Sequence, residues 1–228
     1  MLTAPEKTIN QVQIVYQDAD LLVLNKPAGW LTLKIDGRIQ PSLQDWVESQ
    51  LQVKVAGRGG IVHRLDKETS GLILVAKSQT VFDQLQDQFK SRKVSKKYWA
   101  LVRGRGIPSE GQILAPIGRL PQNKLQFGVV PGGKPADTSF RAIKELSIAG
   151  ENYTLLEVAP KTGRTHQIRV HLKYLGYPIF GDAWYGGKKE KNRPMFLLAK
   201  AIEFRHPRTG QMIKLEIDLP QDLSKILV

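Results

Sequence analysis

The sequence contains no cysteine among its 228 residues. This absence excludes disulfides, thiolate metal sites and a cysteine nucleophile, and it fits a reducing, cytoplasmic setting. Long hydrophobic runs are also missing, because the longest apolar stretches, such as 21–24 and 72–76, are far too short to span a bilayer. The N-terminal segment MLTAPEKTIN lacks the apolar region of a secretory signal. We therefore expect a cytoplasmic protein with no membrane partner.

Acidic residues are scarce relative to basic ones. The 34 Lys and Arg against 21 Asp and Glu give a formal net charge of +13. A basic proteome could produce such a surplus, but clustering within 90–97 and 188–193 favours a polyanionic partner, since each neutralised phosphate releases counterions. We therefore expect a polyanionic partner, with Lys93, Lys96 and Lys97 as candidate residues for binding its phosphates.

Signatures of metal and nucleotide chemistry are absent as well. The stretch 132–135 is not a Walker A loop because proline breaks it, and 104–106 opens no dinucleotide-binding helix. No G-x-S-x-G segment occurs. His166 and His171 are five residues apart, which at about 100° per residue places them roughly 140° apart on a helix, unlike a zinc-binding pair. We expect no metal and no cofactor.

The apolar patterns predict more strands than helices. Strands are expected at 12–16, 21–25, 72–77, 97–102, 138–143, 153–158 and 212–219, and helices after Ser42, over 81–89 and over 165–174. The two kinds of element do not alternate regularly. The sequence therefore predicts an α+β fold with a mixed, mainly antiparallel central sheet flanked by helices and loops. The stretch 104–135, rich in Gly and Pro, is the best candidate for long loops or a subdomain junction.

Two polar segments could carry chemistry. In the first, 63–71 (HRLDKETSG), Asp66 could cap a helix or bond its own backbone in a turn, and composition alone favours the turn. The second, 161–171 (KTGRTHQIRVH), places three basic side chains and two imidazoles at a predicted helix start. It is either an RNA-facing helix start or a solvated helix end, and Arg164 next to Gly163 favours the former.

Five ordered segments resemble those of RluA-type RNA pseudouridine synthases. They are NKPAG, HRLDKETSGL, KKYWALV, KTGRTHQIRVHL and GYPIFGDAWYG. The resemblance implies the pseudouridine synthase fold over residues 12–228, with two subdomains around one cleft, after a short extension at 1–11. It implies an enzyme that isomerises uridines of rRNA or tRNA, without a cofactor, as a monomer with no obligatory protein partner. The S4-type domain of many relatives is not expected, since about eleven residues precede the first strand.

The resemblance also assigns roles to single residues. Asp66 resembles the catalytic aspartate, and Arg64 resembles the arginine that enters the base stack when the uridine is flipped out. Tyr98 is similar to the tyrosine that packs on the flipped base, and Arg164 to the arginine that pairs with the aspartate. Two residues depart from the usual pattern: Tyr177 and Leu198 stand where histidines are common, and both could alter the substrate pocket.

Two other classes of function remain open at this point. A non-catalytic RNA-binding module would explain the charge, although it would not explain ionisable residues held in glycine-punctuated loops. A base-excising glycosylase would use a similar carboxylate but lacks the ordered set of segments. The residues do not distinguish attack by Asp66 on the base from attack on C1′, and they do not identify the RNA or the uridine.

Overall fold

The computed structural model describes residues 12–37, 40–51, 53, 55, 57–186 and 195–227. In these ranges one sheet of nine strands has the order β1-β2-β3-β10-β4-β9-β8-β5, with β11 paired to β10. Its strands are β1 (Gln13–Gln17), β2 (Leu21–Lys26), β3 (Ser70–Ala76), β4 (Ser95–Arg103), β5 (Glu110–Leu114), β8 (Asp137–Ile148), β9 (Glu151–Pro160), β10 (Leu197–Arg205) and β11 (Met212–Glu216). Among these described strands, β3 and β10 pair in parallel and all the other pairs are antiparallel. The predicted α+β fold with a mixed, mainly antiparallel sheet is confirmed.

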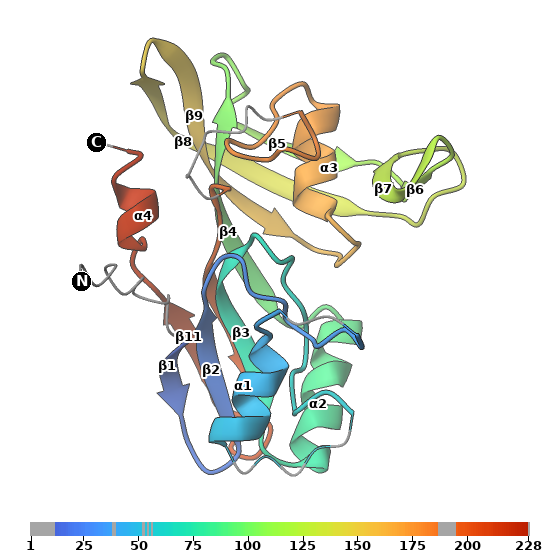
Figure 1. Ribbon diagram of the computed structural model, residues 1–228, viewed down its shortest axis with the longest axis vertical. Coiled ribbons are helices and arrows are strands. Elements are labelled where there is room, and N and C mark those ends of the chain that lie inside the picture. Colours follow the sequence, from blue (N-terminus) through green and yellow to red (C-terminus); the bar gives the residue numbers. More distant parts are fainter. Residues whose placement is uncertain are drawn as a thin grey trace, which may run out of the picture.

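The sheet is long and twisted, and it has two halves joined by β4 (Figure 1). Helices α1 (Leu43–Gln50) and α2 (Gln79–Lys90) lie beside β2 and β3 in one half, whereas α3 (Gln167–Tyr174) lies beside β8 and β9 in the other. The short helix α4 (Gln221–Ser224) is near the C-terminus. Because β4 runs through both halves, segments distant in sequence meet where the two halves join.

The stretch 104–135 differs from the expectation of long loops. It contains β5 and a hairpin of β6 (Ile117–Leu120) and β7 (Asn123–Val129), which form a separate two-stranded sheet. The hairpin projects from the body (Figure 1). All seven side chains of β7 are exposed or half-buried, and its apolar alternation is limited to Leu125, Phe127 and Val129, which is too short to stand out among the surrounding Gly and Pro.

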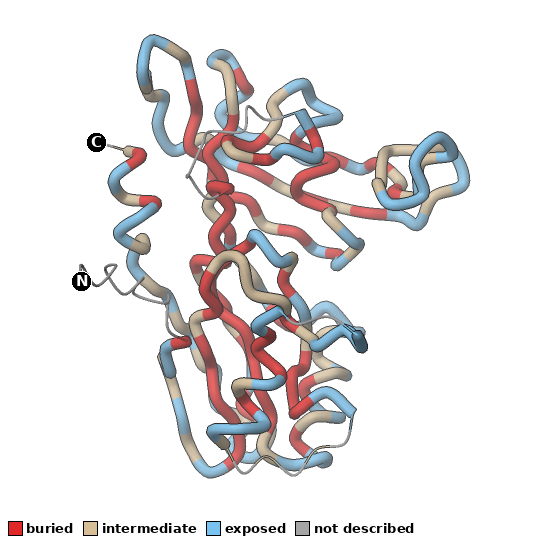
Figure 2. The backbone as a smooth tube through the Cα atoms, viewed as in Figure 1, coloured by how far each residue is buried: buried red, intermediate tan, exposed pale blue. Residues whose placement is uncertain are grey.

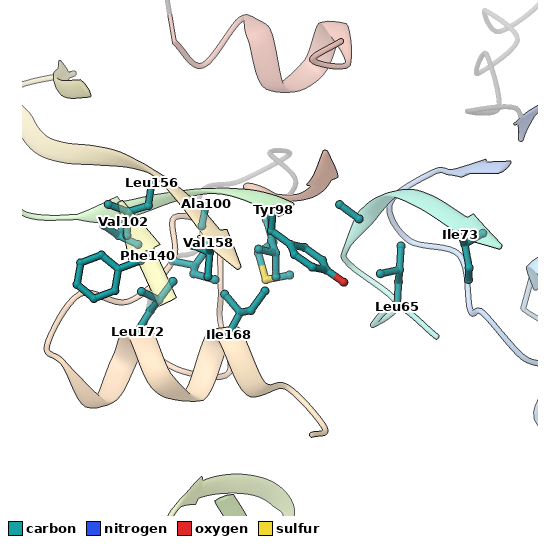
Figure 3. Close-up of a cluster of buried hydrophobic side chains, with 14 of the residues drawn as sticks. Leu65, Ile73, Tyr98, Ala100, Val102, Phe140, Leu156, Val158, Ile168 and Leu172 are labelled. Carbon is teal, nitrogen blue, oxygen red and sulfur yellow. The ribbon is translucent and has the colours of Figure 1, made fainter. Parts of the chain in front are cut away.

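Buried side chains run along the central strands through both halves (Figure 2). Every residue of β3 is buried, which explains why that strand reads as a continuous apolar run. One hydrophobic cluster contains Leu65 and Ile73 from one half and Phe140 and Leu172 from the other (Figure 3). This shared core fixes the relative position of the segments that carry the two polar motifs.

Local sequence signals explain several boundaries. Ser42 caps α1 by accepting the N–H of Asp45 at 3.1 Å, as its position before the apolar residues predicts. The strand β10 was not predicted, because Lys200 interrupts its apolar pattern. Lys200 is buried, and its Nζ bonds Glu216 Oε1 at 2.7 Å. In the part of the chain that the structure describes, no helix is long and apolar enough to cross a membrane.

Candidate active site

A pocket of about 490 Å³ is lined by the loop before β3, the end of α2, the start of β4, the segment from the end of β9 into α3, and Leu197 of β10. It brings together Arg64, Asp66, Tyr98 and Arg164, which the sequence predicts as site residues. Seven of the residues that line the pocket are Lys or Arg, and Asp66 is the one acidic residue in the lining. The pocket therefore suits an anionic ligand and presents a single acidic group to it.

Asp66 is half-buried in a loop that several hydrogen bonds hold. Its carbonyl accepts the N–H of Thr69 at 3.1 Å, which closes a turn. Thr32 Oγ1 donates to the carbonyl of Leu65 at 2.7 Å and accepts the N–H of Leu65 at 3.1 Å. A strand follows the loop, so Asp66 does not cap a helix. Its carboxylate bonds another side chain and not its own backbone.

That side chain belongs to Arg169. Arg169 Nη1 donates to Asp66 Oδ2 at 3.2 Å, while Nε and Nη2 donate to the two carboxylate oxygens of Asp182 at 2.7 and 2.9 Å. Arg169 and Asp182 are buried, with 5% and 1% of their surfaces exposed. Burial lowers the pKa of Arg169, but the hydrogen bonds and charges of Asp182 and Asp66 outweigh it and raise the pKa overall. The guanidinium therefore stays charged and links two carboxylates.

The predicted pairing of Arg164 with Asp66 is wrong. Arg164 lines the pocket, but its Nε donates to the carbonyl of Pro135 at 3.0 Å. The physical reason is the helix boundary: α3 begins at Gln167, so Arg169 lies within the helix whereas Arg164 lies in the turn before it. The motif GRTHQIR offers two arginines, and the sequence resemblance selected the first. The buried partner Asp182 marks the second as the residue that bonds Asp66.

Lys26, in the NKPAG segment, forms a hydrogen bond to the loop that carries Asp66. Its Nζ donates to the carbonyls of Pro27, Trp30 and Lys67 at 2.9, 2.8 and 3.1 Å. Burial lowers the pKa of Lys26 to about 7. Three acceptors nevertheless require three N–H donors, which only the ammonium form supplies. Lys26 thus fastens the residue next to Asp66 to the end of β2.

Tyr98 extends from β4 toward Leu65 and lies beside Ile168 (Figure 3). It is 9% exposed and lines the pocket. Burial, and then the charge of Asp66, raise the pKa of Tyr98, so its hydroxyl remains protonated. Tyr98 gives the pocket an apolar wall close to the carboxylate.

The histidines of the second motif have different partners. His171 bonds Thr138 Oγ1 at 2.9 Å and the carbonyl of Ala115 at 3.0 Å. His166, which sequence reasoning did not assign to the site, lines the pocket; its Nδ1 bonds the hydroxyl of Tyr185 at 2.6 Å and its Nε2 lies 4.0 Å from Asp66 Oδ2. The two imidazoles therefore do not share a ligand position.

One group among the described residues has ligand atoms close enough for a metal ion: Asp18, Asp20 and His206. Its own bonds already engage these atoms. His206 Nδ1 accepts the N–H groups of Arg208 and Thr209, its Nε2 bonds Asp18, and Asp20 is paired with Arg208. The group joins the β1–β2 turn to the β10–β11 turn, apart from the pocket.

The first basic cluster divides between the pocket and the surface. Lys96 lines the pocket, Lys97 is exposed and pairs with Glu157 at 3.2 Å, and Lys93 is exposed in the turn after α2. The second cluster, within 188–193, lies outside the described residues. Tyr177 and Leu198, which replace common histidines, do not line this pocket; Leu198 is buried in another hydrophobic cluster.

Comparison with known proteins gives a consistent result. A family model described as RNA pseudouridylate synthase matches residues 20–174. The chain is 37% identical over 221 residues to "Uncharacterized RNA pseudouridine synthase YlyB" of Bacillus subtilis, covering 95% of this chain and 72% of that protein. It is 37% identical to "Ribosomal large subunit pseudouridine synthase D" of Pseudomonas aeruginosa, covering 95% and 71%. An "Uncharacterized RNA pseudouridine synthase" of Chloroflexus aurantiacus is 42% identical to this chain. The match covers 89% of this chain and 64% of that protein.

A solved structure agrees with these sequence matches. "Human RNA Pseudouridylate Synthase Domain Containing 1" superimposes with a TM-score of 0.77 at 29% identity, covering 92% of this chain and 84% of that one. The fold and the family model therefore point to the same group of proteins.

We predict that Asp182→Asn destabilises the protein although it leaves the shape of the side chain unchanged. The substitution leaves buried Arg169 with Asp66 as its one remaining carboxylate, bonded through a single nitrogen, so the free energy of unfolding should fall by about 3 kcal/mol. Glu203→Gln is the matched control, because Glu203 pairs with Lys214 at 3.3 Å on the surface and should contribute less than about 1 kcal/mol. Urea unfolding measures both. Equal losses for the two variants would show that the buried pair has no special role.

Proposed function

Because the chain belongs to the RNA pseudouridylate synthase family, whose members isomerise uridine in RNA, we propose that it uses Asp66 as its catalytic carboxylate on a flipped uridine. The observation that supports this proposal is the hydrogen bonding of the Asp66 carboxylate, in which one oxygen is bonded and the other is not. Arg169 bonds Oδ2, whereas no hydrogen bond from a described residue engages Oδ1. An oriented carboxylate with one free oxygen in a pocket is suited to attack a nucleoside.

The reaction breaks the N1–C1′ bond of uridine, turns the base and joins C5 to C1′. A carboxylate can form a covalent intermediate or stabilise a cationic sugar and then depart. Water must stay away from C1′ while the base is free, because it would hydrolyse the intermediate. Leu65, Tyr98 and Ile168 supply apolar surface next to Asp66 for this purpose.

The target base is inaccessible inside a stacked helix, so the enzyme extrudes it at a cost of a few kcal/mol. Arg64 is exposed at the pocket, two residues before Asp66, and its planar cation suits the vacated place in the stack. Tyr98 packs against the extruded base. Arg164 donates a hydrogen bond from Nε to the carbonyl of Pro135, and we propose that its two other guanidinium nitrogens contact the RNA backbone.

Ribosomal RNA is the substrate class that the relatives favour. The Pseudomonas aeruginosa relative and one from Nitrosomonas europaea, 36% identical, both carry the name "Ribosomal large subunit pseudouridine synthase D". No relative reported above is named for tRNA. Large-subunit ribosomal RNA is therefore the first substrate to test.

Lys96 differs from its neighbours in a way that suits a phosphate contact. It lies on the same face of β4 as Tyr98, and its Nζ sits 5.8 Å from the centre of the Phe89 ring. Burial lowers the pKa of Lys96, and no described carboxylate pairs with it. A partly buried cation without an anion is costly, and an RNA phosphate at the pocket would remove that cost. Lys93 is proposed as a peripheral contact.

Asp66→Asn tests the proposed catalyst. It should abolish pseudouridine formation while RNA affinity stays within about threefold of wild type, because the basic residues supply most of the affinity. The measurements are nucleoside analysis of the RNA product and an equilibrium binding titration. Substantial isomerisation by a pure Asp66→Asn preparation would remove Asp66 from the mechanism.

A comparison of Lys96→Met with Lys97→Met tests the phosphate contact. Loss of one phosphate contact should reduce the slope of log affinity against log salt by about 1. We expect this reduction for Lys96→Met and a smaller one for Lys97→Met, since Lys97 is already paired with Glu157. Titrations at several salt concentrations give both slopes. A larger effect at Lys97 would place the RNA on the opposite face of β4.

A further inference from the structure

A chain of polar contacts runs from the β6–β7 hairpin to the pocket carboxylate. The N–H of Phe127 in β7 donates to Tyr185 Oη at 3.2 Å. The same oxygen lies 2.6 Å from His166 Nδ1. On the other side of the imidazole, Nε2 lies 4.0 Å from Asp66 Oδ2. The contacts thus connect a projecting hairpin with the residue proposed to do the chemistry.

The backbone of His166 is held in an uncommon conformation. Its φ of 55° and ψ of 23° are left-handed, and its side chain does not cap the helix that follows. Gln167 secures this turn, because its Oε1 accepts from Thr162 Oγ1 at 2.7 Å and from the N–H of Arg164 at 2.9 Å. A non-glycine residue in this region is a reason to ask what its side chain does. Here the strained turn directs the imidazole toward Tyr185 and Asp66.

The surroundings of His166 keep its imidazole neutral. The rings of Phe127, Trp184 and Tyr185 meet it edge-on at 5.9, 5.7 and 5.5 Å between centroids. Burial is the largest cause that lowers the pKa of His166. The charged groups around it are Asp66 and Asp182, which raise that pKa, and Arg169 and Arg64, which lower it, so that the net shift is downward. On the hairpin, Arg119 lies over the outer ring, Phe127, at 5.0 Å.

The hydrogen bonds also select one tautomer. Tyr185 Oη accepts the N–H of Phe127, and burial raises the pKa of Tyr185, so its hydroxyl keeps a proton to donate. Among the described residues His166 Nδ1 is the acceptor within reach of that proton. A neutral imidazole that accepts at Nδ1 carries its own proton on Nε2. The N–H of His166 therefore lies on the side of Asp66.

We propose that His166 is a positioning residue whose Nε2–H donates to Asp66 Oδ2 when substrate fills the pocket, and that Tyr185 sets its tautomer. This inference rests on the proposed role of Asp66. Contacts of this kind are often long without substrate and shorten in the complex, which fits the distance of 4.0 Å. Arg169 and His166 would then both engage Oδ2 and leave Oδ1 to react.

A neutral donor has an advantage over a second cation at this place. Arg169 already supplies the positive charge that Asp66 requires, and Tyr185 stacks on that guanidinium at 4.9 Å. Another full charge would hold the carboxylate more firmly in the ground state without stabilising the transition state. A neutral N–H orients the carboxylate and leaves its charge available. The Phe127 contact makes the orientation depend on the position of the hairpin.

The tautomer can be measured on the wild-type protein without an activity assay. The chain has four histidines, so nitrogen-15 NMR of the side chains resolves each imidazole, and a His166 variant assigns the signal. At pH 7 we expect His166 to be neutral with the proton on Nε2. Tyr185→Phe, which removes only the hydroxyl, should mix the two tautomers. Tyr174→Phe is the matched control, since Tyr174 is 61% exposed at the end of α3. This substitution should leave the tautomer of His166 unchanged.

Single-turnover kinetics at saturating RNA then tests the effect on Asp66. His166→Met removes the donor, while His166→Gln keeps an N–H at a similar distance; both are unbranched and carry the same strain at a φ of 55°. We expect the rate of the chemical step to be about tenfold lower in His166→Met than in the wild-type protein. In His166→Gln the rate should be within about threefold of wild type, and RNA affinity should be nearly unchanged in both variants.

Several results would overturn the proposal. They are a proton on Nδ1, a charged imidazole at pH 7, equal rates for the Gln and Met variants, or wild-type rates for both. If a variant fails to fold, the tautomer of the wild-type protein still decides the matter. A wild-type protein that forms no pseudouridine would refute the proposed function and leave the tautomer result intact, so the two failures are distinguishable.

Discussion

The guanidinium of Arg169 lies between two carboxylates, and the geometry of the pocket depends on it. Asp66 comes from the loop that precedes β3, whereas Asp182 comes from the segment that follows α3. One buried cation therefore bonds a carboxylate 103 residues before it in the sequence and another 13 residues after it. Breaking a buried pair of this kind exposes the remaining charge to a low-dielectric surrounding, so the arrangement tolerates little change.

The other contacts of the pocket serve the same carboxylate. Lys26 holds the loop through the carbonyl of Lys67, and Thr32 holds it through Leu65. Tyr98 and Ile168 bring apolar surface from β4 and α3 (Figure 3). The result is one acidic group, oriented from its Oδ2 side, in a pocket otherwise rich in basic side chains. Such a site suits a polyanionic ligand and presents a single carboxylate to it.

Much of this arrangement could be predicted from the sequence. Apolar patterns located β2, β3, α1 and α2, and the ordered motifs drew attention to Arg64, Asp66 and Tyr98, which all line one pocket. Patterns failed where tertiary contacts decide. The charged residue Lys200 interrupts the apolar pattern of β10, so the sequence does not predict this strand. Lys200 can be buried there because it pairs with Glu216 on β11, a contact that no local pattern shows. The choice between Arg164 and Arg169 depends on where α3 begins and on Asp182, which no local pattern reveals.

We propose that Asp66 acts in an isomerisation and not in a hydrolytic removal of the base. Both reactions would use the same pocket and both would break N1–C1′, so only the fate of the base separates them. Large-subunit ribosomal RNA incubated with the wild-type protein can be digested to nucleosides and analysed by liquid chromatography with mass detection. We expect a nucleoside with the mass of uridine and a different retention time, with no free uracil. Release of uracil in proportion to the uridine consumed would instead show that the protein removes the base by hydrolysis.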